Sequence, residues 1–284
     1  METGQKYMAV TSNLESNNQN SLILSIQVSL NGLSFCILDA PVNKIIQLYT
    51  KNFTQRLNPI NTLSEIEKIF DSQLSGLSFN QVIVTHVNEL ATLVPKDLFD
   101  VKYLADYLKF NNKIFASDFI AHDEIENHDI MSIYVPFVNI NNYFIDKFGQ
   151  FIYQHYSTTL IKTIIDNNRY NLNKKVYAHI QNKQFELVVI DSGKLVFFNS
   201  FIYETSEDFI YYTLFAFEQL GLDPEKVDFN FIGEIQNEEH ALFTIASQYI
   251  EHVTFGSRYK HVLFDAASTP ETNHQHFTLI HALS

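Results

Sequence analysis

The chain has 284 residues, of which 46% are hydrophobic and 14% aromatic, and its formal net charge is −13. This length is enough for two ordinary domains with buried cores, and the aromatic content excludes a disordered chain. The acidity argues against nucleic acid as the main partner, because phosphate binding depends on a surplus of Lys and Arg. We interpret the excess of acidic residues as a solvated surface.

The amino-terminal segment and the single cysteine favour a cytoplasmic protein. Residues 1–21 are polar and rich in Asn, Ser and Gln, so we expect a disordered or frayed terminus that lacks the features of a signal peptide. No apolar run approaches the length of a membrane helix, which predicts that the chain has no membrane span. Cys36 lies in an apolar run, and one cysteine can form neither an internal disulfide nor a cysteine-based zinc site.

The first half of the chain begins with a predicted hairpin. Residues 22–30 largely alternate apolar and polar side chains, as half-buried strands do. Asn31-Gly32 follows and predicts a tight turn in which both residues take a positive φ. Thr62 and Glu65 have the spacing of a capping box and predict the start of a helix. The further elements are strands over 33–38, 45–53 and 82–87 and helices over 62–74 and 98–108.

The second half repeats this order of elements. Residues 176–181 alternate as a strand, and Asn182-Lys183 and Ser192-Gly193 predict two hairpin turns. Thr205 begins a capped helix that Gly221 ends. The remaining elements are strands over 185–190, 195–203 and 228–235 and a helix over 238–249.

Both halves therefore read strand, hairpin, strand, strand, capped helix, strand, helix, which predicts a duplication. We divide the chain into a first lobe over 22–172, with extra strands and helices, and a second lobe over 173–284. Between the repeats we expect a solvated polar loop over 121–129. The other expected elements are strands over 113–116, 131–137 and 150–156, a helix over 158–166, and short strands in 251–284 that return to the second half.

This order resembles the ribonuclease-H-like doubling of the actin, sugar-kinase and heat-shock-chaperone superfold. More closely, the chain resembles a bacterial family of unknown function with an actin-like ATPase fold, through its hairpin over 24–32, the run over 93–99 and the stretch over 185–233. In outline it is also similar to actin-like proteins of pilus assembly and type II secretion. The resemblance implies an α/β fold of two tandem βββαβα lobes whose nucleotide motifs are degenerate.

In working members of the superfold, each lobe opens with an Asp-x-Gly strand that organises Mg²⁺ and approaches phosphate. The resemblance places the remnants of this nucleotide cleft at Gln27, Ser29, Asn31, Gly32, His179, Gln181, Gly233 and Glu234. Gln27 and His179 replace the two aspartates, and neither supplies the negative oxygen ligand that Mg²⁺ prefers. We therefore expect no catalytic residue, no metal and no cofactor, while binding of ATP and Mg²⁺ without turnover stays open.

Other chemistry has little support in the sequence. No Gly-x-Ser-x-Gly elbow, P-loop or dinucleotide fingerprint is present. His274, His276 and His281 admit a metal site, but packed or solvated side chains are the simpler interpretation.

The leading hypothesis is a non-catalytic actin-like protein that acts as a scaffold for an unidentified protein partner. The alternative is a divergent ATP-binding kinase or ATPase whose metal ligands come from acids such as Asp39, Asp118 or Asp191. A filament subunit is a third possibility that rests on the fold alone. The sequence leaves the oligomeric state undecided.

Overall fold

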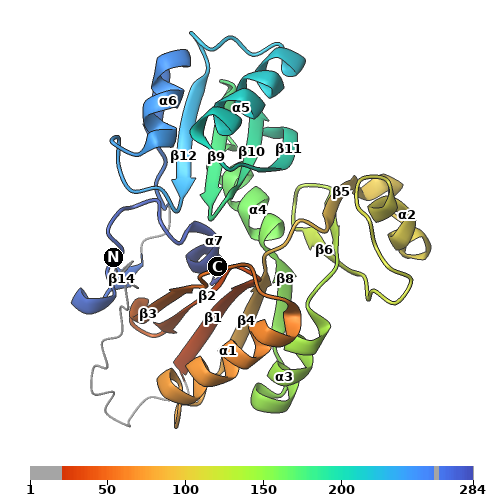
Figure 1. Cartoon of the computed structure of the whole chain (residues 1–284), viewed down its shortest axis with the longest axis vertical. Coiled ribbons are helices and arrows are strands. Elements are labelled where there is room, and N and C mark those ends of the chain that lie inside the picture. Colours follow the sequence, from red (N-terminus) through yellow and green to blue (C-terminus); the bar gives the residue numbers. More distant parts are fainter. Residues whose placement is uncertain (1–20, 259–261, 284) are drawn as a thin grey trace. The chain divides into compact units, whose positions relative to one another are not determined.

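A computed structural model describes residues 21–258 and 262–283, and its described strands form three sheets (Figure 1). The described residues fall into two compact units. The first holds residues 21–159, 262–269 and 279–283, and the second holds residues 160–258 and 270–278. The predicted frayed terminus, apart from Ser21, lies outside the described residues.

The first unit is built on a six-stranded sheet with the order β14-β3-β2-β1-β4-β8. Its strands are β1 (Leu22–Ser29), β2 (Gly32–Asp39), β3 (Lys44–Asn52), β4 (Gln81–His86), β8 (Ile152–His155) and β14 (Leu263–Phe264). β1, β2 and β3 pair in antiparallel fashion, whereas β4 and β8 continue the sheet in parallel. One face of β1 packs its apolar side chains against α1 (Pro59–Gln73) and α3 (Val138–Phe148).

The β1–β2 hairpin forms as predicted, but its turn differs. Ser29 pairs with Gly32, and neither Asn31 nor Gly32 has a positive φ, so the expected conformation of this turn is wrong. Gly32 is needed for another reason, because a Cβ atom there would lie 2.7 Å from the carbonyl oxygen of Lys51. The glycine therefore permits close approach of the third strand.

The predicted capping box of the first helix is also wrong. α1 begins at Pro59, and the Asn58 side chain accepts a hydrogen bond from the backbone N–H of Asn61. Proline at the first helical position and an asparagine cap together define an earlier start. Thr62 is consequently a buried residue inside the helix.

The second unit contains a five-stranded sheet with the order β11-β10-β9-β12-β13. Its strands are β9 (Lys175–Gln181), β10 (Gln184–Asp191), β11 (Lys194–Ile202), β12 (Asp228–Gly233) and β13 (His252–Phe255), and its helices include α5 (Ser206–Leu220) and α6 (Ala241–Tyr249). Ser192 and Gly193 have φ values of 51° and 71°, which confirms this hairpin turn. The capping box of Thr205 and the left-handed Gly221 at the end of α5 are confirmed as well.

The repeat is visible in the sheet orders. The sequence β3-β2-β1-β4-β8 in the first unit matches β11-β10-β9-β12-β13 in the second. In each, a helix follows the third strand and another follows the fourth. The second helix of the first repeat is α3, however, and not the helix predicted over 98–108.

An insertion between β4 and α3 makes the third sheet, with the order β5-β7-β6. Its elements are β5 (Ala91–Pro95), β6 (Ala121–Ile125), β7 (Ile130–Tyr134), two 3₁₀ turns (Lys96–Leu98 and Val101–Tyr103) and α2 (Leu104–Lys109). The strand predicted over 113–116 is absent, because Asp118 accepts a hydrogen bond from the N–H of Phe115 and closes a turn. The polar loop predicted over 121–129 is instead a hairpin, since Ala121 and Ile125 are buried.

Two other predictions need correction. The strand expected over 150–156 ends at His155, and α4 (Tyr156–Asn168) begins at the next residue. In the last segment, β13 joins the second sheet as expected, but β14 pairs in parallel with β3 of the first sheet, and α7 (Phe277–His281) follows. No helix among the described residues has the length and apolarity needed to cross a membrane.

Candidate functional site

The hairpin that opens the second unit carries a buried pair of ionisable side chains. The two-residue turn at Asn182-Lys183 places His179 of β9 directly opposite Glu186 of β10. Nδ1 of His179 lies 2.6 Å from Oε2 of Glu186. The two residues are 3% and 0% exposed. The position predicted for a metal-binding aspartate is thus occupied by an imidazole bound to a carboxylate of the same sheet.

Both carboxylate oxygens of Glu186 have further partners. Gln181 donates to Oε2 at 3.0 Å and Gln184 to Oε1 at 2.7 Å. The hydroxyl of Ser200, on β11, lies 3.4 Å from Oε1. We call these five residues the Glu186 cluster. Its carboxyl group is surrounded by hydrogen-bond partners, as a buried polar group requires.

Gly233 and Glu234 lie against this hairpin. Gly233 has φ +88°, and a Cβ atom there would collide with the carbonyl oxygen of Ile180 and lie 2.9 Å from Cδ2 of His179. The backbone N–H of Glu234 donates to Ile180 O at 2.8 Å. The structure therefore brings the four predicted site residues of the second unit together.

Residues 274–276 of the same unit bind the loop of Gly233 and Glu234, which the resemblance counts among the remnants of the nucleotide cleft. The N–H of Gly233 donates to the carbonyl oxygen of His274 at 2.9 Å. The carboxylate of Glu234 accepts from the N–H of His276 at 3.1 Å and lies 3.4 Å from its Nδ1. Arg258 Nη1 holds the same segment through the carbonyl oxygens of Thr272 (2.8 Å) and Gln275 (2.7 Å). The polar groups of this loop are thus satisfied within the unit.

The four predicted site residues of the first unit also lie together, on the β1–β2 hairpin. Gln27 pairs with Ser34 on one side and with Thr85 on the other. The Ser29 hydroxyl donates to Gly32 O at 3.2 Å and accepts from the N–H of Asn31 at 3.1 Å. Ser29 therefore stabilises the turn itself, and no carboxylate stands at these positions.

A groove of about 430 Å³ lies beside this hairpin, at the start of α1. Glu65 bridges Lys51 and Lys68 there, with N–O distances of 2.7 and 2.8 Å. These two lysines hold the pKa of Glu65 below its usual range. Both cations are engaged by a carboxylate of the groove.

A second buried polar cluster lies in the segment predicted to be a solvated loop. Asp123 of β6 accepts hydrogen bonds from the N–H of His155 (2.9 Å), the hydroxyl of Thr158 (2.8 Å) and the hydroxyl of Tyr134 (3.0 Å). Burial raises the pKa of Asp123. Ala121, Asp123 and Ile125 alternate with exposed residues along β6, so they share the inward face of the strand. This period-two pattern is the sequence signal for a strand that the prediction of a loop missed.

His155 does not form a catalytic triad, although a serine is close. Its Nε2 donates to the carbonyl oxygen of Asn88 at 3.1 Å, so Nδ1 accepts from the Ser157 hydroxyl at 2.7 Å. Ser157 is fully buried and Asp123 contacts only the backbone of His155. Burial lowers the pKa of His155 to about 3 and that of His86 to about 4. Both imidazoles are neutral structural groups at neutral pH.

Two of the remaining acidic candidates, Asp191 and Asp39, belong to different units. Asp191 pairs with Lys174 at 3.6 Å, and Asp39 ends β2 in the other unit. His274 donates through Nε2 to the carbonyl oxygen of Ile235 at 2.6 Å and stacks on Phe255, so it is a packed side chain. Among the described residues, no three His, Cys, Asp or Glu side chains come together to hold a metal ion.

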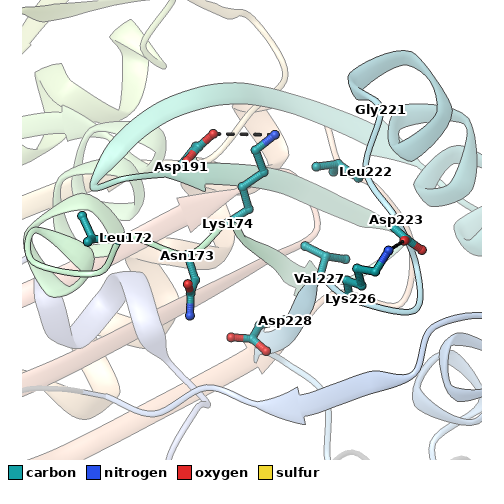
Figure 2. A pocket seen from close by; sticks show the side chains of 10 residues that line it. All are labelled: Leu172, Asn173, Lys174, Asp191, Gly221, Leu222, Asp223, Lys226, Val227 and Asp228. Carbon is teal, nitrogen blue, oxygen red and sulfur yellow. Dashed lines mark hydrogen bonds and ion pairs between the residues drawn. The ribbon is translucent and has the colours of Figure 1, made fainter.

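The second unit also has a polar groove of about 560 Å³ at the opposite end of β9 from Gln181 (Figure 2). Figure 2 shows its two ion pairs, Lys174 with Asp191 and Lys226 with Asp223. Because each lysine already has a carboxylate partner, the groove offers no uncompensated cation.

The insertion exposes an unusual amount of apolar surface. Six of the nineteen large hydrophobic side chains that are exposed in the described residues fall within 22 consecutive positions. We call these six the insertion surface; they are Leu98, Val101, Tyr103, Phe110, Phe115 and Phe119. Neighbouring residues such as Phe99, Leu104 and Tyr107 turn inward and pack on Val94 and Ile133. The segment around α2 (Figure 1) therefore combines side chains that pack inward with large apolar side chains that are exposed.

The two matching sheet orders define a protein with an actin-like ATPase fold. The chain is similar to a Bacteroides thetaiotaomicron protein described as having an actin-like ATPase fold and unknown function, with TM-score 0.75, 20% identity and coverage of 84% of this chain and 91% of that one. It is also similar to the structure described as the PilM-PilN type IV pilus biogenesis complex, with TM-score 0.61, 10% identity and coverage of 92% and 97%.

The chain belongs to the family described as "Protein of unknown function (DUF3822)", which matches residues 11–253. No curated protein matches it in sequence.

Proposed function

We propose that this protein is a non-catalytic actin-like scaffold that binds another protein through the insertion surface. The observation that carries the proposal is the exposure of six large apolar side chains within one short stretch, with Phe110 at 89% and Phe115 at 70%. Soluble proteins that expose contiguous apolar patches commonly use them to bind partners. Aromatic residues also contribute much of the binding energy at protein interfaces.

Two features support the non-catalytic part of the proposal. Glu186 is a carboxylate directly beside the second Asp-x-Gly position, and side chains of four residues surround it. The Gly233-Glu234 loop binds His274 and His276 of the same chain. ATP and Mg²⁺ would have to displace both sets of hydrogen bonds, at a cost of roughly 1 kcal/mol or more for each bond.

The similar PilM structure supports the protein-binding part, since its description names a complex with a second protein. We propose the same general use of the fold here, with an apolar partner segment as the ligand. A cytoplasmic location fits the proposal, because the single cysteine, Cys36, is buried and forms no disulfide.

A photo-cross-linking amino acid at position 110 tests partner binding in cells that produce the full chain. We expect one adduct of defined mass that disappears when Phe115→Ser is added. The matched control is the same cross-linker at Tyr170, which is 91% exposed outside the insertion. Equal adducts from both positions, or none from position 110, would refute the scaffold role.

Calorimetric titration with ATP and Mg²⁺ tests the absence of nucleotide chemistry separately. We expect no saturable heat at millimolar ligand (Kd weaker than about 1 mM). Magnesium-dependent turnover that is lost in His179→Ala or Gln27→Ala would overturn the non-catalytic assignment and favour the kinase or ATPase alternative.

A further inference from the structure

Residues 272–276, near the carboxyl end, are bound to the second unit mainly through backbone groups, and we call this segment the strap. No helix or strand of the described residues includes it. The strap contacts the loop after β12 at two points: His274 O accepts from the N–H of Gly233 at 2.9 Å, and the N–H of His276 donates to the Glu234 carboxylate at 3.1 Å. Segments outside the sheets and helices that depend on a few contacts are the ones that open locally most easily.

Arg258, which follows β13, holds the strap through one residue's worth of donors. Its backbone N–H donates to Asn273 O at 2.7 Å, and its Nη1 donates to Thr272 O at 2.8 Å and to Gln275 O at 2.7 Å. Hydrogen bonds from a charged donor are stronger than those between neutral groups. Arg258 therefore positions three carbonyl oxygens of the strap at once.

His274 is the most deeply buried residue of the strap, with an exposure of 4%. Its imidazole stacks on Phe255, with ring centroids 4.5 Å apart and an angle of 9° between the planes. Nε2 lies 2.6 Å from the carbonyl oxygen of Ile235, which can only accept, so Nε2 carries the proton. Within the part of the chain that the structure describes, Nδ1 makes no hydrogen bond. A neutral imidazole thus seats the strap.

A second proton on His274 would be poorly accommodated in this position. Burial lowers the pKa of His274 and outweighs the hydrogen bond to Ile235, which acts in the opposite direction. Of the two charged side chains that act on the ring, Arg258 lowers the pKa further and Glu234 raises it. Protonation therefore favours a detached strap, in which the imidazole returns to water.

One contact of the strap responds to acid in the opposite direction. Nδ1 of His276 lies 3.4 Å from the Glu234 carboxylate, so a protonated His276 binds Glu234 more strongly. The side chain of Glu234 is 47% exposed, however, and water screens ion pairs at the surface. The buried His274 therefore decides the direction of the response. His276 also has a φ of 54°, a conformation that costs energy in a residue other than glycine and that detachment relieves.

We propose that the strap is an acid-released latch on the loop over 233–235, in which Arg258 holds the strap and His274 responds to pH. Closed, the strap occupies the N–H of Gly233, the carboxylate of Glu234 and the carbonyl oxygen of Ile235. Protonation of His274 releases these groups to solvent. The contribution of His274 to closure is complete above about pH 6.5, where a solvated imidazole is neutral, and is lost as the pH falls through the lower pKa of the closed state. The latch does not depend on the insertion surface.

Amide hydrogen exchange of the full chain, resolved by residue with NMR at about pH 7.5 and about pH 5, tests the latch. The N–H of Gly233 is bonded to the strap, whereas the N–H of Glu234 is bonded to Ile180 O at 2.8 Å and is an internal control. After correction for intrinsic exchange rates, we expect opening at Gly233 to increase about fivefold to thirtyfold at the lower pH, the upper limit being set by a solvated histidine. A Gly233 amide that does not respond, or Gly233 and Glu234 amides that open together, would overturn the proposal.

Three variants separate the role of Arg258 from the response to pH. Arg258→Ala removes two side-chain hydrogen bonds to the strap, so opening at Gly233 should rise at least about tenfold at neutral pH while the Glu234 amide is unchanged. His274→Gln keeps a side-chain donor but does not titrate, so the response to acid should disappear. His276→Gln is the matched control and should retain the response. A response that persists in His274→Gln, or that is lost in His276→Gln, would refute His274 as the responding group.

Discussion

Gln27 on β1 and His179 on β9 occupy equivalent positions in the repeat, but the side chains beside them on the neighbouring strands differ. In the first unit, Gln27 lies between Ser34 and Thr85, and Ser34 in turn faces Thr50. In the second unit, the matching row is Ser200, Glu186, His179 and Ile232. One row is uncharged and the other contains a buried ionisable pair.

The difference shows two ways in which this fold fills the positions where the resemblance predicts a metal-binding aspartate. The uncharged row leaves the buried hydroxyls of Thr50 and Thr85 without a hydrogen-bond partner. In the other row, four neighbours satisfy the carboxyl group of Glu186, and the stability of this row depends on the set being complete. The second unit is therefore the more sensitive of the two to a single substitution.

The largest expected effect follows from removing Glu186. Glu186→Ala leaves His179, Gln181 and Gln184 without their shared acceptor, so the free energy of unfolding should fall by about 3–5 kcal/mol. The counterpart Ser34→Ala in the first unit should cost less than about 1 kcal/mol. The chain has no Trp, so urea unfolding is best followed by circular dichroism. Similar losses in the two variants would contradict the comparison.

The pH dependence of stability tests the first unit through a buried histidine, His86. The pKa of His86 falls from 6.5 to about 4 because the imidazole is buried in the first unit. A lowered folded pKa means that protonation favours the unfolded chain, so this contribution is complete above pH 6.5 and is lost as the pH falls toward 4. The loss for His86 alone approaches about 3 kcal/mol.

Between about pH 4 and 6.5, His86→Gln should reduce the slope of the unfolding free energy against pH by the contribution of about one proton. The control is Thr85→Val, which changes the neighbouring buried position on β4 without a titratable group and should leave the slope unchanged. An unchanged slope in His86→Gln would mean that His86 is protonated in the folded protein.

Much of the fold follows from local patterns, and the site follows from register. The hairpins at Asn182-Lys183 and Ser192-Gly193 and the cap at Thr205 were predictable, because turn and cap chemistry is encoded in a few adjacent residues. The turn at Asn182-Lys183 also sets the register of β9 and β10. Counting residue pairs outward from it predicts that His179 lies opposite Glu186.

What local patterns do not encode is long-range partnership. Asp123 accepts a hydrogen bond from His155, and β14 pairs with β3 of the first sheet. Both interactions join residues that are far apart in the chain. The positions of the predicted site residues within each unit were reachable by analogy, whereas the occupation of the Gly233 loop by His274 was not.

Glycine substitutions sharpen the comparison at the next level of magnitude. Gly233→Ala combines a φ of +88° with a collision at Ile180 O, and we expect a loss of about 2–3 kcal/mol. Gly76→Ala has a similar φ of +77° and open space around it, so it measures the backbone cost alone, about 1 kcal/mol. Gly32→Ala tests the collision without a positive φ. Equal losses at Gly233 and Gly76 would show that the close approach to Ile180 carries no energy.

The smallest effects come from the caps of the two equivalent helices. Thr205 begins α5 with a reciprocal capping box that includes Asp208, whereas Asn58 begins α1 with one side-chain hydrogen bond. The Asp208 carboxylate accepts from the N–H groups of Glu204 and Thr205, which lowers its pKa. We expect Thr205→Ala to cost about 1 kcal/mol or slightly more and Asn58→Ala slightly less. Thermal unfolding of both variants measures this difference. Both capping residues are exposed, so neither should lose packing on substitution. A larger loss at Asn58 than at Thr205 would therefore contradict the expected order and would mean that the Asn58 side chain also fixes the path of the chain into α1.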